Sequence, residues 1–132
     1  MEYLTRDPID IEEWHRRAVD ELDGASVEFL GIVRGEDEGH PVAFLDYEAY
    51  VPMAEQKIAV LVAEAKGKWA LRRVYVQHRI GRVNAGKVSV IVGVQAPHRE
   101  EAFEACRFLI DAIKKEVPIW KSEKRCLEKS LE

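Results

Sequence analysis

The sequence has 132 residues, of which 47% are hydrophobic and 33% are charged, with 20 basic and 24 acidic residues. A chain of this length can fold as a single domain, residues 1–132, and its net charge of −4 disfavours a nucleic-acid-binding protein, because such proteins usually carry a basic excess. The start, "MEYLTRDPID", lacks a signal peptide's basic and apolar regions, and no apolar run reaches the roughly 18 residues of a membrane span, so a cytoplasmic protein without membrane contact is predicted.

The first half of the chain is predicted to contain a short strand at "EYL", two helices and two longer strands. The first helix spans residues 10–22, with Asp10 as N-cap and Gly24 after its end, and its apolar face comprises Ile11, Trp14, Ala18 and Leu22. Residues 25–34 and 41–50 have strand patterns, and the polar "GEDEGH" between them is predicted to be a loop. The second helix spans residues 52–69, and its apolar face comprises Met53, Ile58, Leu61, Val62 and Ala65.

The second half is predicted to contain two strands, residues 72–80 and 87–96, and a helix that starts near Pro97. Ala102, Cys106, Leu109 and Ile113 lie on one side of this helix. The order is therefore β-α-β-β-α-β-β-α. Short loops between adjacent strands favour antiparallel pairing, so the predicted class is α+β.

One segment, "GRVNAGKV" at residues 81–88, almost matches a phosphate-binding P-loop. It ends in Val88, which has no hydroxyl for magnesium, and it leads into a β-branched strand, whereas a P-loop opens a helix. The residues from Gly81 to Gly86 are therefore predicted to form a hairpin loop.

The two cysteines have neither a metal-binding spacing nor a disulfide framework. Cys106 lies on an apolar helix face and is predicted to be a core residue. Cys126 lies in a charged tail of about residues 122–132, and no metal site is predicted.

Two cations, His98 and Arg99, lie at the predicted start of the last helix, where the helix dipole favours acids such as the nearby Glu100 and Glu101. The pair becomes favourable if an anion binds at the helix N-terminus. The alternative is two solvated side chains, because each misplaced charge costs only about 0.3–1 kcal/mol.

Arg34, at the end of a strand, either lies on the surface or projects into a site at the sheet edge. His78 and Arg79 are mid-strand residues for which a structural role is expected, and His15 and His40 are predicted to lie on the surface.

Lys114 and Lys121 flank a corner in "IKKEVPIWKSEKR", residues 113–125. The dipole favours lysines in a last helical turn, which explains Lys114 without a site, whereas Lys121 follows a chain restricted by Pro118 and Trp120. Arg34, His98, Arg99 and these lysines together suit an anionic substrate and a reaction that uses amines as acids, bases or nucleophiles.

From Gly24 to Lys121 the sequence resembles the large, catalytic subunits of molybdopterin synthase. The resemblance rests on several segments in the family's order: "GASVEFLGIVR", "LDYEAYVPMAE", "VYVQHRIGRVNAGKVSVIVGV", "APHREEAFEACRFLIDAIK" and "PIWK". It implies an α/β-hammerhead fold and a homodimer in which each subunit binds one small ubiquitin-like subunit, giving a heterotetramer.

The resemblance also implies a sulfurtransferase that converts cyclic pyranopterin monophosphate to molybdopterin without a metal or other cofactor. Two sulfurs arrive as the thiocarboxylate at the Gly-Gly tail of the small subunit. By position, Lys114 and Lys121 match the catalytic lysines, and substrate contacts fall on Ile32, Val33, Arg34, His98, Arg99, Lys114, Lys121, Ser122 and Glu123. Family members usually continue past the second lysine into a segment with a glycine and a tryptophan, whereas this sequence has "SEKRCLEKSLE".

Two functions outside this family are alternatives. The first is a non-catalytic homodimer that binds an anionic metabolite or a partner's tail, which would keep the arginines but need not keep both lysines. The second is an RNA-binding protein, which conflicts with the net charge and lacks an aromatic stacking set.

Overall fold

The computed structural model describes residues 1–17 and 20–125, the last three of these by their backbone alone. Within these residues the chain forms three helices and eight strands in two sheets. The elements are β1 Leu4–Thr5, α1 Ile11–Arg17, β2 Ala25–Ile32, β3 Glu36–Asp37, β4 His40–Ala49, α2 Val51–Lys68, β5 Arg73–Arg79, β6 Gly81–Asn84, β7 Val88–Ala96, α3 Arg99–Glu116 and β8 Ile119–Arg125.

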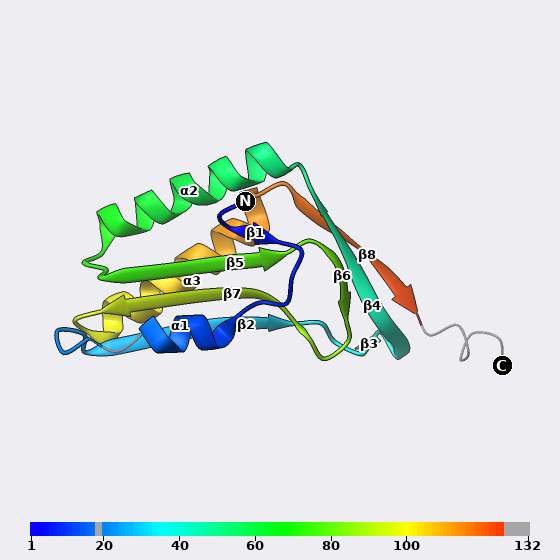
Figure 1. Ribbon diagram of the computed structural model, residues 1–132, viewed down its shortest axis with the longest axis horizontal. Coiled ribbons are helices and arrows are strands. Elements are labelled where there is room, and N and C mark those ends of the chain that lie inside the picture. Colours follow the sequence, from blue (N-terminus) through cyan, green and yellow to red (C-terminus); the bar gives the residue numbers. More distant parts are fainter. Residues whose placement is uncertain (18–19, 126–132) are drawn as a thin grey trace.

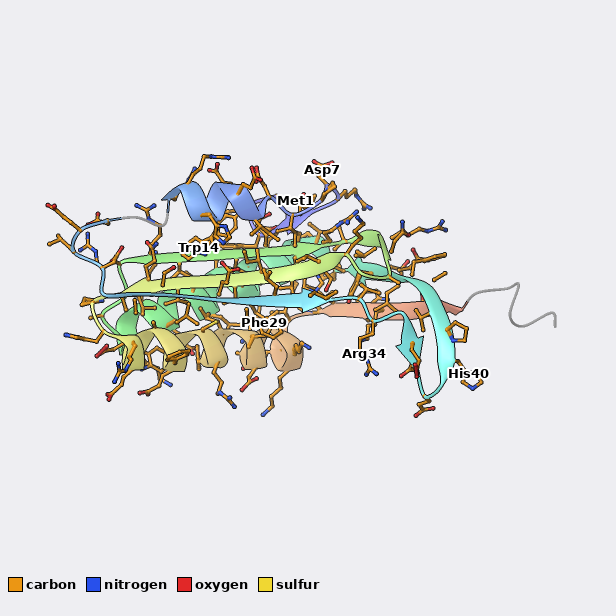
Figure 2. All side chains as sticks on the ribbon, turned by 90° about the horizontal axis from the view of Figure 1, so that it is seen from below. Met1, Asp7, Trp14, Phe29, Arg34 and His40 are labelled. Atoms are coloured by element: carbon orange, nitrogen blue, oxygen red, sulfur yellow. The ribbon has the colours of Figure 1, made fainter. Side chains whose placement is uncertain are left out.

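The main sheet has the strand order β1-β5-β7-β2. Its β5–β7 and β7–β2 pairs are antiparallel, and β1 pairs with β5 in parallel. Helix α1 covers one face of this sheet, and α2 and α3 cover the other (Figures 1 and 2). The α+β class with mostly antiparallel strands is therefore confirmed.

Burial on both faces explains why β7 reads as a continuous apolar run rather than an alternating one. Every residue from Ser89 to Ala96 is buried. On the α1 side, Trp14 is fully buried and packs so closely over Gly93 that a Cβ there would lie 2.4 Å from the indole. The predicted apolar face of α3, from Ala102 to Ile113, is buried against the sheet, as expected from its helical spacing.

The second sheet pairs β4 with β3, β6 and β8. Strands β4 and β8 run side by side away from the main sheet (Figure 1), which agrees with the hammerhead-type arrangement that the resemblance implies. A small separate core of Val33, Val42, Leu45 and Val83 supports this sheet.

Several predicted boundaries were wrong. In α1, Asp10 is the cap, since its Oδ1 accepts the Glu13 N–H at 2.9 Å, but Leu22 lies in a turn and is 65% exposed; Ala18 is outside the described residues. In α2, Met53 is 53% exposed and its neighbour Ala54 occupies the core position.

The second sheet accounts for the remaining differences from the predicted elements. The predicted loop at Gly81–Gly86 contains β6, and residues 122–125, assigned to a charged tail, belong to β8. Residues 36 and 37 of the predicted polar loop form β3. All three strands hydrogen-bond to β4, which supplies the backbone partners that their own polar sequences do not indicate.

Cys126 lies outside the described residues. Across the described helices, none is both long and apolar enough to span a membrane.

Candidate functional site

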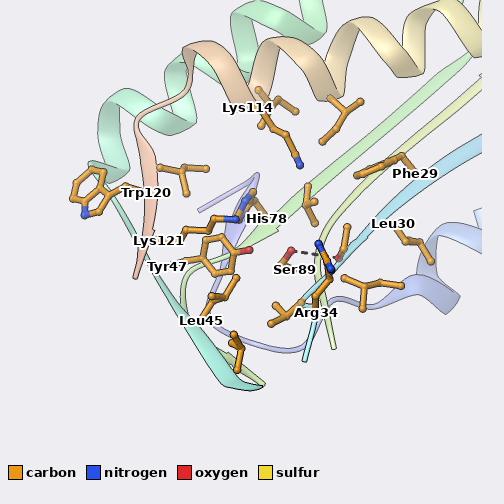
Figure 3. Close-up of a pocket in the computed structure, with 18 of the residues that line it drawn as sticks. Phe29, Leu30, Arg34, Leu45, Tyr47, His78, Ser89, Lys114, Trp120 and Lys121 are labelled. Carbon is orange, nitrogen blue, oxygen red and sulfur yellow. Dashed lines mark hydrogen bonds between the residues drawn. The ribbon is translucent and has the colours of Figure 1, made fainter. Parts of the chain in front are cut away.

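A pocket of about 550 Å³ opens where the main sheet meets the second sheet and the C-terminal end of α3. Its wall is formed by apolar side chains from β2, β4 and α3 together with a smaller number of polar groups. Figure 3 shows Lys114 from α3, Lys121 from β8 and Arg34 from the segment after β2 entering this space. The polar lining residues are Arg34, Glu36, Asp37, Tyr47, His78, Ser89, Lys114, Trp120 and Lys121.

A β-bulge directs Arg34 into the pocket. Gly31 pairs with Val90 but the next residue, Ile32, pairs with Val88, so Ser89 is the extra residue of the bulge. The Ser89 hydroxyl donates to the Gly31 carbonyl at 3.3 Å. The bulge bends the end of β2, so the chain that follows turns toward the second sheet.

Val33 anchors the chain beyond this bend. It is 2% exposed, its N–H donates to the Lys87 carbonyl at 3.0 Å, and its carbonyl accepts the Gly86 N–H at 2.7 Å. Ile32, Val33 and Arg34, three of the substrate contacts that the resemblance implies, all line the pocket. Val33 also belongs to the small core of the second sheet.

The corner between α3 and β8 brings the two lysines into the same pocket. Helix α3 closes with the Val117 N–H donating to Ile113, and the Pro118 carbonyl then accepts the Tyr50 N–H at 3.2 Å. From this corner β8 pairs with β4, which sets Lys121 opposite Tyr47. Lys114 reaches the same space from the last turn of α3.

Trp120, at the pocket's edge, also supports this corner. Its indole N–H donates to Glu48 on β4 at 2.9 Å, although the side chain is 52% exposed. This bond fixes the start of β8 in addition to the backbone pairing.

His78 is a polar residue of the pocket for which the sequence predicted only a structural role. It is 8% exposed, its Nδ1 lies 2.7 Å from the Arg79 carbonyl, and the Tyr47 ring packs edge-on against it with centroids 5.0 Å apart. Burial, with the nearby charge of Lys114, lowers the pKa of His78, so the ring is neutral at neutral pH. The alternation of buried Val76, His78 and Ile80 is a period-2 signal that could have identified this residue as inward-facing.

His98 and Arg99 do not lie in this pocket within one chain. They line a separate shallow hollow with Gly24, Glu100 and Glu101 at the opposite end of α3. Arg99 and Lys114 are 15 positions apart on one helix, which corresponds to about 23 Å at 1.5 Å per residue. His98 is largely exposed, and its Nδ1 lies 3.8 Å from Glu101.

Ser122 lines the neighbouring hollow instead of the pocket, because successive side chains of a strand point to opposite faces. Glu123 pairs with Leu45 through its backbone, and its side chain is outside the described part of the chain. Glu36 and Asp37 of β3, predicted from the sequence to lie in a loop, also line the pocket.

The pocket is suited to an anion. Arg34, Lys114 and Lys121 offer only donors and positive charge, and such groups form their strongest hydrogen bonds with phosphate or carboxylate oxygens. Among the side chains that the structure describes, no three His, Cys, Asp or Glu are grouped so that they could hold a metal ion.

Comparison with known proteins identifies similar chains. The family model described as MoaE protein matches residues 4–116. The molybdopterin synthase catalytic subunit of Nostoc sp. is 45% identical over 121 residues, which is 91% of this chain and 73% of that protein. The rice protein of the same name is 44% identical over 115 residues, or 87% of this chain, and this chain spans only 60% of its length.

The fold is also similar to that of a solved structure, the crystal structure of molybdopterin synthase from Staphylococcus aureus. The TM-score is 0.87 at 37% sequence identity, and the match covers 94% of this chain and 90% of that one.

Proposed function

The chain belongs to the MoaE protein family, and from that premise we propose that it is the catalytic subunit of a molybdopterin synthase. It converts cyclic pyranopterin monophosphate to molybdopterin by adding two sulfur atoms. The observation that supports this function is the convergence on one pocket of Arg34, which follows β2, with Lys114 and Lys121, which flank the corner between α3 and β8. A non-catalytic anion-binding module would not require both lysines there.

Sulfur arrives on a second protein, a small ubiquitin-like subunit with a C-terminal Gly-Gly thiocarboxylate. The relatives are named catalytic subunits, which implies another subunit in their enzymes. Cys106 is a poor sulfur carrier because it is buried among core residues and burial raises its pKa to about 11. A glycine tail suits delivery into a pocket because it passes a narrow opening without side-chain clashes.

Lys114 is the proposed catalytic residue. Its ammonium orients the thiocarboxylate and protonates the oxygen that leaves the substrate. Lys121 binds substrate charge and transfers protons, and Arg34 binds the phosphate by charge-assisted hydrogen bonds. Because β8 and the end of α3 are held by backbone bonds on both sides of Pro118, the two lysines approach one substrate with little conformational freedom.

His98 and Arg99 contribute to the pocket of a second copy of the chain. A separation of about 23 Å along α3 prevents one small substrate from contacting both Arg99 and Lys114 of the same protomer. A homodimer in which the start of one α3 approaches the other protomer's pocket removes this conflict. With two small subunits the assembly is a heterotetramer, and its proposed location is the cytoplasm, which cell fractionation checks.

The experiment that tests the function is incubation with pyranopterin precursor and thiocarboxylated small subunit, followed by assay of the dithiolene product. Lys114→Ala should lower the single-turnover rate by about 10²–10⁴-fold, the usual contribution of a positioned acid or base. Lys115→Ala is the matched control, because Lys115 is exposed in the same helical turn and is not among the pocket-lining residues. A native rate in the Lys114 variant would contradict its catalytic role.

A further inference from the structure

The pocket contains one buried titratable side chain whose chemistry the proposed roles do not use, because the carboxylates of Glu36 and Asp37, which also line it, are not buried. Arg34, Lys114 and Lys121 can donate hydrogen bonds but cannot accept them. Two further polar groups are poor bases, since the Ser89 hydroxyl is already bonded to a backbone carbonyl and Tyr47 presents a phenol. His78 is a buried imidazole in the same space, and a neutral imidazole can accept a proton.

The hydrogen bond of His78 determines which ring nitrogen is basic. The Arg79 carbonyl can only accept, so Nδ1, at 2.7 Å from it, carries the hydrogen and donates. Nε2 of the neutral ring therefore has a free lone pair. Among the described residues, Nε2 has no hydrogen-bond partner. It is not one of the buried polar atoms without a partner, so it remains accessible to solvent. The lone pair is therefore available to a molecule in the pocket.

The surroundings keep this base neutral and fixed in orientation. The charged side chains that share the pocket with His78 are Lys114 from α3, Lys121 from β8 and Arg34 beyond β2, with Glu36 and Asp37 from β3. On the β4 side it meets the uncharged Tyr47 ring. Burial and the charge of Lys114 both act against the imidazolium, so the proton-accepting form is present at neutral pH.

The proposed reaction has a step that needs such a base. When the thiocarboxylate sulfur attacks a substrate carbon, the product is a thioester that joins the substrate to the small subunit's terminal carbonyl. The sulfur becomes free only when water cleaves the acyl–sulfur bond. Water is a weak nucleophile at neutral pH, and a positioned base accelerates its attack by about 10²–10⁴-fold.

We infer that His78 is the general base of this step and takes a proton at Nε2 from the water that attacks the acyl carbon. The water oxygen bonds to that carbon, the carbon–sulfur bond breaks, and its electron pair remains on sulfur. The imidazolium then returns the proton to the thiolate, so thioester and water give a carboxylic acid and a thiol without any change of oxidation state. This role rests on the proposed function and assigns His78 to sulfur release, separate from sulfur attack.

The test compares His78→Gln with native protein in a single turnover that is followed by intact-protein mass spectrometry of the small subunit. Glutamine can hydrogen-bond to water but cannot take its proton. The variant should form the substrate–small-subunit adduct at the native rate and release it at least about 10²-fold more slowly, so that the adduct accumulates. Hydroxylamine, which cleaves thioesters, should discharge the accumulated adduct. His40→Gln, a change at an exposed histidine at the start of β4, is the control and should behave as native.

Release at the native rate in a folded His78→Gln protein would overturn the inference while leaving the proposed function intact. Failure of the native protein to form either adduct or dithiolene would instead refute the proposed function. The pH dependence of release in the native protein decides the matter even if the variant does not fold. Release should slow as the pH falls through the lowered pKa of His78, and a rate that does not fall at any acidic pH at which the protein stays folded would exclude His78 as the base.

Discussion

A mixing experiment tests whether two copies of the chain build each active pocket. One variant is Lys114→Ala, which removes the catalytic amine, and the other is Arg99→Ala, which removes a cation at the start of the same helix. Loss of charge-assisted bonds of about 1.5–3 kcal/mol should weaken precursor binding by roughly 10–100-fold in the Arg99 variant. Each variant alone is therefore nearly inactive when the precursor concentration is kept below its native dissociation constant.

The expected recovery follows from the geometry of α3. Because about 23 Å separate Arg99 from Lys114 in one protomer, the proposed shared pocket takes these residues from different protomers. Random exchange of equal amounts makes half of the dimers mixed, and one of the two pockets in each mixed dimer is then native. About one quarter of all pockets, and thus about one quarter of native activity, should return. If both residues served the same protomer's pocket, no native pocket would form.

The assay is dithiolene production after the two variants are unfolded and refolded together, with mixed dimers counted by native mass spectrometry. A second mixture, of native chain with a chain carrying both substitutions, provides the control. It should retain about one quarter of native activity if the pocket is shared and about one half if it is not. The shared-pocket model is refuted if mixed dimers form in the first mixture and activity does not return.

Four further predictions concern stability and reactivity. Gly93→Ala should lower the free energy of unfolding in urea by about 1–3 kcal/mol, because its Cβ would lie 2.4 Å from the buried Trp14 ring; an unchanged midpoint would show that the indole moves aside at no cost. Glu55→Gln should lower the free energy of unfolding by about 1–3 kcal/mol and speed amide exchange in β1, because the carboxylate accepts three consecutive backbone N–H groups at 2.7–3.1 Å. Amide exchange in β1 as slow as in the native protein would contradict this. The pKa of His78 is lowered in the folded protein, so as the pH falls the unfolded chain binds this proton first. The free energy of unfolding should therefore decrease as the pH drops below about 6.5. In urea titrations at several pH values, His78→Gln should make the free energy of unfolding depend less on pH. Burial raises the pKa of Cys106 to about 11. At about pH 8 this thiol should therefore react with a maleimide far more slowly in the native state than in the unfolded state. Mass spectrometry of the labelled peptide measures both rates.

Periodicity predicted the core elements because it reflects a local property of the chain. The apolar face of α3, from Ala102 to Ile113, and the strand pattern of β7 are properties of consecutive residues, and the structure buries both. Strands β6 and β8 were missed for the complementary reason. Their sequences are short and polar, and their stability comes from backbone bonds to β4, which is distant in the sequence.

The relative positions of the site residues were predictable only where those residues are close in the sequence. The corner at Pro118 lies between Lys114 and Lys121, so their shared orientation could be anticipated from the connector between them. The same local geometry, applied to α3, separates Arg99 from Lys114 by the rise of one helix, so within one protomer the five cations do not form one cluster. His78 was passed over although its buried position follows from alternation along β5.

By itself the sequence determined the class of the fold, the family, and the residue types available for anion binding and acid–base chemistry. Beyond the two lysines that flank the Pro118 corner, only the tertiary structure decided which of these residues meet. Arg34 reaches the lysines through a bulge between β2 and β7, and Lys121 takes its place through pairing between β4 and β8. The physical reason is that strand pairing joins segments that are far apart along the chain, so the position of each functional group depends on partners that no local pattern encodes.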